Sequence, residues 1–130
     1  MMISVLIPTY RRAKDLARCL AALEKQTRPA DEVLVVVRDS DVETWQLLEA
    51  FPNVLPLRIV TVSVPGVVAA MNAGVDVAKG EIIAITDDDA APHADWLERI
   101  EAHYLADAKV GGVGGRDRMH YGTHLVEGQS

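Results

Sequence analysis

Strand-length apolar runs constrain the fold of this chain more than any other feature of its sequence. ISVLIP (3–8), DEVLVVV (31–37) and EIIAIT (81–86) carry apolar residues at successive positions, and LRIVTV (57–62) is a fourth run of strand length. A strand that is apolar on both faces must be covered on both faces, which is typical of parallel sheets packed between helices. The runs therefore predict four strands of one largely buried sheet.

Helices are predicted between these strands because apolar residues recur there at helical spacing. The four predicted helices are one carrying Leu16, Cys19, Leu20 and Leu23, one over 41–51 with Asp41 as its N-cap, one reaching to about Ala78, and one from about Ala94 to Ala106. The alternation of strand and helix predicts an α/β domain, a Rossmann-like, mostly parallel sheet flanked by helices. KVGGVGG (109–115) predicts a fifth strand, and the tail over 116–127 predicts a hairpin turning at Gly122.

Length and composition limit the partners. The 130 residues suit one domain, and the formal net charge of −6 comes without any run of Lys or Arg. Nucleic acid and anionic membrane surfaces are therefore not expected as partners. The first apolar run ends at Pro8 and no apolar stretch of about 18 residues follows, so we expect no signal peptide or transmembrane segment and a cytoplasmic location, with peripheral membrane contact left open. Cys19, the single cysteine, is predicted to be core filler.

Polar residues follow the predicted strands at the point where each strand ends. They are Thr9 to Arg12 after the first strand, Arg38 to Asp41 after the second, and Asp87 to Asp89 after EIIAIT. The carboxyl ends of parallel strands meet at one edge of the sheet, and ligands bind beyond that edge. We therefore expect Asp39 and the three consecutive aspartates to lie in one cleft.

The three consecutive aspartates point to a metal ion. One aspartate could cap the following helix, a role that suits Asp89 or Asp95, but a cap needs a single carboxylate. Like charges on adjacent carboxylates repel unless a cation joins them. Mg²⁺ and Mn²⁺ bind one or two protein carboxylates and share their other positions with phosphate oxygens and water. The aspartates therefore predict a divalent metal ion shared with a phosphorylated ligand.

Motifs of other phosphate-binding classes are missing from the sequence. It contains no G-x-x-x-x-G-K-[ST], and no G-x-G-x-x-G follows the first strand. A phosphoreceiver domain needs an acidic pair after the first strand, where this chain has Thr9 and Tyr10. A nucleotidyltransferase needs a glycine-rich basic loop there, whereas PTYRR is basic without glycine, so this class is kept only as a weaker alternative.

Three segments together resemble the N-terminal, nucleotide-binding half of a family 2 glycosyltransferase. They are SVLIPTYRRAKDLARCLAALEKQT, DEVLVVVRDSD and GVVAAMNAGVDVAKGEIIAITDDDA with the following P and WL, and the resemblance covers roughly Ile3 to Gly115. It implies the A-type glycosyltransferase fold and a metal-dependent, inverting transfer of a sugar from a nucleoside-diphosphate sugar, UDP-linked in the typical case. The acceptor, whether sugar, lipid or protein, is left open.

The resemblance also implies roles for single residues. The implied donor site consists of Thr9, Tyr10, Arg12, Asp39, Asn72, Asp87 and Asp88, and the implied metal ligands are Asp89 and Asp87. Thr9 and Tyr10 match the strand exit that lies against the base, and Asp39 matches the acidic residue that hydrogen-bonds the base. Arg38 departs from the family, which usually has aspartate at this position.

The second half of the family's domain has no match in this sequence. Only 41 residues follow Asp89, and no acidic residue among them matches the general base of the family. We therefore expect residues 1–130 to be one truncated domain without the acceptor half. A non-catalytic nucleotide-sugar-binding module acting with a partner chain is the alternative function, and a homo-oligomer formed through residues 116–127 is expected because the missing half would leave a strand edge open.

Overall fold

The computed structural model describes residues 2–51, 54–111 and 119–121, in which strands and helices alternate along the chain. The elements are β1 (Ile3–Thr9), α1 (Ala13–Leu23), β2 (Glu32–Arg38), α2 (Val42–Ala50), β3 (Leu57–Val62), α3 (Val67–Val77), β4 (Ile82–Ile85), α4 (Trp96–Gly111) and β5 (Met119–Tyr121). The four strands predicted from the apolar runs are confirmed, each within one or two residues of the expected bounds.

The strands form one parallel sheet in the order β3-β2-β1-β4-β5. Central strand β1 pairs with β2 on one side and with β4 on the other, so that Val5 lies opposite both Val33 and Ala84. The chain builds the sheet outward from β1 in one direction and then crosses to its other side, which makes the ends of β1 and β4 a topological switch point. The predicted parallel α/β sheet is therefore confirmed.

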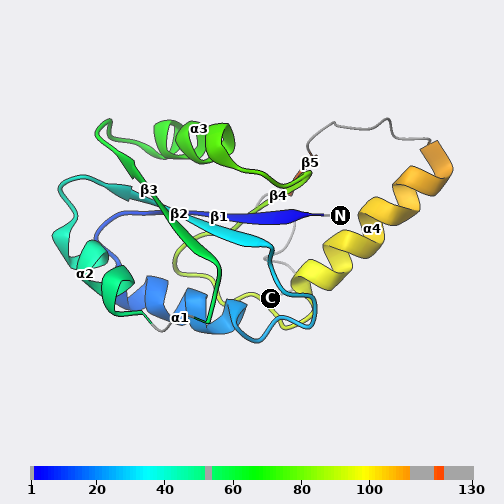
Figure 1. The fold of residues 1–130 in the computed structure, drawn as a ribbon, viewed down its shortest axis with the longest axis horizontal. Helices are drawn as coiled ribbons and strands as arrows, with labels where there is room; N and C mark the ends of the chain where they lie inside the picture. Colours follow the sequence, from blue (N-terminus) through cyan, green and yellow to red (C-terminus); the bar gives the residue numbers. More distant parts are fainter. Residues whose placement is uncertain (1, 52–53, 112–118, 122–130) are drawn as a thin grey trace.

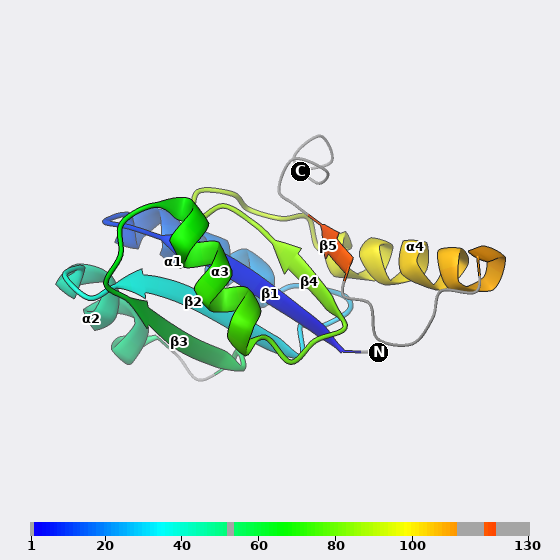
Figure 2. The ribbon, with the colours of Figure 1, turned by 90° about the horizontal axis from the view of Figure 1, so that it is seen from above.

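Helices cover the two faces of the sheet, as Figures 1 and 2 show from perpendicular directions: α3 lies on one face, and α1 and α2 lie on the other. Successive strand residues point to opposite faces. Val5 and Ile7 join the core under α1, whereas Leu6 between them joins the core under α3. Both faces are apolar because both are packed against helices.

The fourth helix and the fifth strand differ from the prediction. Helix α4 continues to Gly111, so the part of the expected KVGGVGG strand at 109–111 is helical. The helix extends this far because Ala106, Ala108 and Lys109 are good helix formers and no Gly or Pro interrupts it before Gly111. The fifth strand is instead Met119–Tyr121, parallel to β4. Residues 112–115 and the expected turn at Gly122 lie outside the described residues.

Helix length gives no sign of a membrane span. Among residues 2–51, 54–111 and 119–121, no helix is both long and apolar enough to cross a bilayer.

Candidate functional site

A cavity of about 570 Å³ lies at the carboxyl ends of β1 to β4; we call it the strand-end cavity. Its lining comes from three strands, from the segments that follow β1 and β4, and from the start of α3 with the residues before it. It consists of Pro8, Thr9, Tyr10, Arg12, Val36, Arg38, Val62, Pro65, Gly66, Val67, Ala70 and Asp87–Asp89. One end is acidic and belongs to β4, and the other end is mainly apolar and belongs to β2, β3 and α3. The cavity therefore lies where ligands bind in open parallel sheets.

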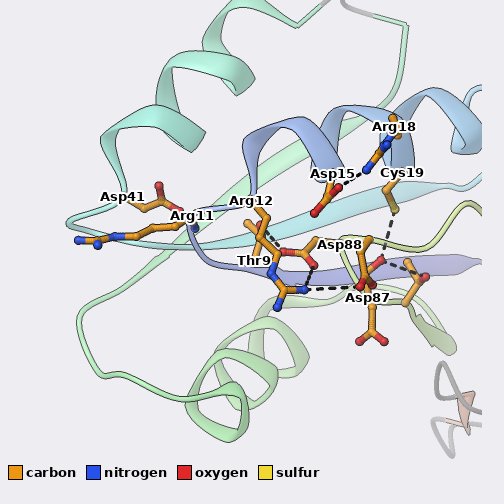
Figure 3. A network of polar contacts seen from close by, with 11 residues as sticks. Thr9, Arg11, Arg12, Asp15, Arg18, Cys19, Asp41, Asp87 and Asp88 are labelled. Atoms are coloured by element: carbon orange, nitrogen blue, oxygen red, sulfur yellow. Dashed lines mark hydrogen bonds and ion pairs between the residues drawn. The ribbon is translucent and has the colours of Figure 1, made fainter.

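The loop after β1 is held in an unusual conformation by Asp41. Arg11 has a φ of 54°, in the left-handed region that residues with a side chain seldom adopt. Its N–H donates a 2.7 Å hydrogen bond to Oδ2 of Asp41, which lies beside Arg11 in Figure 3. The Asp41 side chain is buried and also caps α2 by accepting from the N–H and hydroxyl of Thr44. The predicted N-cap is confirmed, and the same carboxylate positions Tyr10 and Arg12 on either side of Arg11.

The middle aspartate of the three is turned inward. Asp88 is buried, and its Oδ2 accepts a 2.9 Å hydrogen bond from the hydroxyl of Thr9 (Figure 3). Burial raises the pKa of Asp88 above its ordinary value, while the Thr9 hydrogen bond and the charge of Arg12 act in the opposite direction. Asp88 therefore ties the end of β4 to the end of β1.

Arg12 forms ion pairs with two of the three aspartates. Its Nη1 lies 3.5 Å from Oδ1 of Asp88 and 3.5 Å from Oδ2 of Asp89. The side chains of Arg12 and Asp89 are both 54% exposed, so solvent screens the second of these ion pairs. A cationic side chain thus supplies part of the positive charge that the aspartates were expected to need.

The aspartates fit a metal site built from few protein ligands. Asp87 and Asp89 are exposed and line the strand-end cavity, whereas Asp88, which also lines it, is buried and accepts a hydrogen bond from Thr9. Within the described part of the chain, no three acidic, histidine or cysteine side chains converge as a preformed metal cage. A divalent ion bound by one or two carboxylates, with phosphate oxygens as its other ligands, suits this arrangement. The ligand roles of Asp87 and Asp89 stay a prediction.

Cys19 packs directly behind the aspartates. It is fully buried under β1 and β4, as predicted for core filler, and its Sγ lies 3.7 Å from the carbonyl oxygen of Asp87, to which the thiol donates (Figure 3). Burial, followed by the charges of Asp88, Asp89 and Asp87, raises the pKa of the Cys19 thiol to about 12. The thiol is therefore protonated near neutral pH.

We expect Cys19 to resist alkylation in the folded chain. Iodoacetamide reacts with an accessible thiolate, and this thiol is neither accessible nor ionised at pH 8. Mass spectrometry after one hour at pH 8 should show unmodified protein. The same reaction in about 8 M urea, which unfolds the chain, should show complete modification. Rapid labelling of the folded chain would contradict the buried position of Cys19.

Gln26 fixes the segment that follows the aspartates, a role that the sequence analysis missed. Its side chain is buried; Nε2 donates to the carbonyl of His93 over 2.6 Å, and Oε1 accepts from the N–H of Leu97 over 3.0 Å. The N–H of Thr27 adds a 2.8 Å bond to the carbonyl of Ala94. These bonds join the loop after α1 to the start of α4. A buried glutamine in a predicted loop carries no local pattern that reveals such a distant partner.

Arg38 is a second residue whose place in the site was not predicted from the sequence. It lines the strand-end cavity, and its guanidinium carbon lies 5.2 Å from the centre of the Tyr10 ring. Asp39 and Asn72, both predicted to bind the donor, are exposed and are not among the residues that line the cavity. The structure thus brings Thr9, Tyr10, Arg12 and the three aspartates together, and the donor roles of all these residues stay predictions.

Comparison with protein families identifies the chain. The family described as Glycosyl transferase family 2 matches residues 4–128. The chain belongs to glycosyl transferase family 2. A glycosyltransferase of Haloferax volcanii, AglE, is 36% identical over 101 residues, which are 75% of this chain and 33% of AglE. The chondroitin synthase of Escherichia coli is 31% identical over 94% of this chain and 18% of that protein. The family 2 chain therefore spans a third or less of the length of these relatives.

Solved structures confirm the A-type glycosyltransferase fold. The structure of Staphylococcus aureus TarS 1–349 in complex with UDP-GlcNAc is similar, with a TM-score of 0.71 and 29% identity over 82% of this chain and 32% of that chain. The mannosyltransferase PcManGT from Pyrobaculum calidifontis, in complex with GDP-Man and Mn²⁺, is similar with a TM-score of 0.67 and 32% identity over 81% of this chain and 32% of that chain. The predicted family and fold are both confirmed.

Proposed function

We propose that this family 2 chain binds the nucleoside-diphosphate sugar of a metal-dependent, inverting glycosyltransferase. The observation that carries the proposal is the strand-end cavity itself, which joins Tyr10 and the apolar end to the three aspartates along one sheet edge. Apolar and aromatic walls suit a nucleobase, and exposed carboxylates suit a metal-bound diphosphate. The TarS and PcManGT complexes support the proposal, because each holds a nucleotide sugar on a similar fold.

In the proposed reaction, an acceptor hydroxyl attacks the anomeric carbon while the nucleoside diphosphate leaves with its bonding electrons. A bound Mg²⁺ or Mn²⁺ would stabilise the negative charge that develops on the leaving diphosphate. Asp89 and Asp87 would hold that ion, and Arg12 would turn its guanidinium from the aspartates toward the diphosphate. The acceptor and the general base belong to the proposal for the whole protein and are assigned to no residue here.

Isothermal titration of the chain with UDP and with GDP tests the donor site. We expect binding of at least one of them in the presence of Mn²⁺ and none after the metal is removed with EDTA. Uridine and guanosine are the controls, because they carry the base without the diphosphate and should show no effect of Mn²⁺. Equal binding of the diphosphates with and without Mn²⁺ would contradict the proposed role of the aspartates.

A further inference from the structure

We propose that Arg38 selects the base of the donor and favours a base with two neighbouring hydrogen-bond acceptors, guanine or cytosine, over uracil. This inference rests on the proposed function, since it concerns the same strand-end cavity. The resemblance to the family implied uracil, read by Asp39. The geometry of the cavity favours a different residue and a different base edge.

Arg38 lies at the end of the cavity away from the aspartates. Arg38 ends β2, whose outer neighbour is β3, and the aspartates follow β4 on the other side of β1. Two strand spacings, roughly 10 Å, therefore separate the end of β2 from the end of β4. A nucleotide carries its base and its diphosphate on opposite sides of the ribose. With the diphosphate at the aspartates, the base falls beside Arg38.

The guanidinium of Arg38 is held in place but is not satisfied. It lies over one side of the Tyr10 ring, and Arg11 also lies 5.2 Å from the centre of that ring. The Nε atom of Arg38 is buried and has no hydrogen-bond partner in the part of the chain that the structure describes. A buried donor without a partner costs free energy, so the protein alone does not fully satisfy this guanidinium. Arg38 also lines the strand-end cavity, which makes its guanidinium a hydrogen-bond donor group for a base bound there.

The surroundings of Arg38 favour a neutral acceptor. Val36, Val62 and Val67 line the same end of the cavity, and Asp39, the acidic neighbour in sequence, is not part of the lining. A diphosphate is expected to bind at the other end of the cavity, where the carboxylates would hold a metal ion. A flat base can instead pack against the valine side chains and present its edge to the guanidinium.

The chemistry of arginine decides which base edge fits. A guanidinium has five N–H donors in a planar fork and no acceptor, so it pairs best with two adjacent acceptors. Guanine offers N7 and O6, the pair that arginine binds most often in nucleic acids. Cytosine offers O2 and N3. Uracil places the N3–H donor between its two oxygens, and adenine places an amino donor beside N7, so neither offers a matching pair.

Titration of the chain with GDP, CDP, UDP and ADP in the presence of Mn²⁺ tests the inference. We expect GDP or CDP to bind more tightly than UDP and ADP by roughly fivefold to 150-fold, the range that one bidentate base contact supplies. GDP in first place would assign the guanine edge, and CDP in first place would assign the cytosine edge. This ranking uses the unmodified chain and does not depend on the folding of a variant.

Arg38→Lys separates base selection from simple charge, because lysine keeps the positive charge and loses the planar fork. We expect this variant to lose most of the preference for GDP or CDP while it binds UDP as before. Arg58→Lys is the matched control; Arg58 lies near the opposite end of β3, where it donates to the carbonyl of Val77, and the change should leave all four affinities unaltered.

Three results would overturn the inference. UDP could bind most tightly to the unmodified chain, Arg38→Lys could weaken all four nucleotides equally, as expected for a diphosphate contact, or Asp39→Ala rather than Arg38→Lys could remove the base preference. Each of these leaves metal-dependent nucleotide binding, and hence the proposed function, intact. Absence of binding by all four nucleotides would instead remove the proposed function and the inference with it.

Discussion

Replacing Asp89 by alanine is expected to abolish Mn²⁺-dependent binding of nucleoside diphosphates, with a loss in affinity of roughly a hundredfold or more. Asp89 is half-exposed and lines the strand-end cavity, and its one described ion pair is the solvent-screened contact with Arg12. Asp88 cannot take over, since its carboxylate is buried against Thr9. Titration calorimetry of the variant with UDP and GDP, with and without Mn²⁺, measures the loss.

Asp76→Ala is the matched control for this experiment. Asp76 is an exposed aspartate on α3 that does not line the cavity, so its removal changes the net charge by the same amount and should leave nucleotide affinity unaltered. The melting temperature of Asp89→Ala should stay close to that of the unmodified chain, because an exposed ion pair contributes little to stability. Undiminished metal-dependent binding by Asp89→Ala would move the metal away from this carboxylate.

Leu6→Ala is expected to lower the free energy of unfolding by about 2–5 kcal/mol, because Leu6 is fully buried in the central strand and its removal leaves a cavity. Helix α3 packs against the same side chain. A Cβ atom at Gly74 of α3 would overlap Cδ1 of Leu6 and would lie 3.2 Å from Cγ and Cδ2. Gly74→Ala alone should therefore destabilise the chain, because overpacking that costs about 1–3 kcal/mol opposes a helix-propensity gain of about 1 kcal/mol.

In the Leu6→Ala background, Gly74→Ala should raise the free energy of unfolding instead of lowering it. In the Leu6→Ala background the overlap is gone, and Gly74→Ala then fills part of the cavity and gains about 1 kcal/mol in helix propensity. Urea denaturation of the two single variants and the double variant measures this coupling. Asp76→Ala on the same helix is the control and should have one effect in both backgrounds. An equal cost of Gly74→Ala in both backgrounds would show that α3 does not rest on Leu6.

The strands were predictable because burial on both faces leaves a local record in the sequence. The runs that form β1 and β2 are apolar at successive positions, and a parallel sheet under helices is the arrangement that buries them. The tail leaves no such record. The three residues of β5 are too few to show a periodicity, and the lysine and valine before Gly111 suit a helix or a strand in isolation.

The site was predictable where one residue type repeats at one strand end, as Asp87–Asp89 do, because sheet topology alone brings strand ends together. It was not predictable where position depends on side-chain packing. Arg38 and Asp39 are adjacent at the end of β2, and only the three-dimensional structure places the first in the cavity lining and the second outside it. The inward turn of Asp88 likewise depends on Thr9, a residue 79 positions away.

The carboxylate of Asp41 fixes the conformation of the loop after β1, so the conformational entropy of this loop is lost when the chain folds. An arginine in the left-handed region costs roughly 1–2 kcal/mol, and the hydrogen bond from the Arg11 N–H to this buried carboxylate offsets that cost. The conformation of Tyr10 and Arg12 is therefore set during folding, so the nucleotide binding proposed above would lose little further entropy in this loop. Transplanting this loop into another scaffold would thus require Asp41 to be carried along, even though Asp41 does not line the cavity.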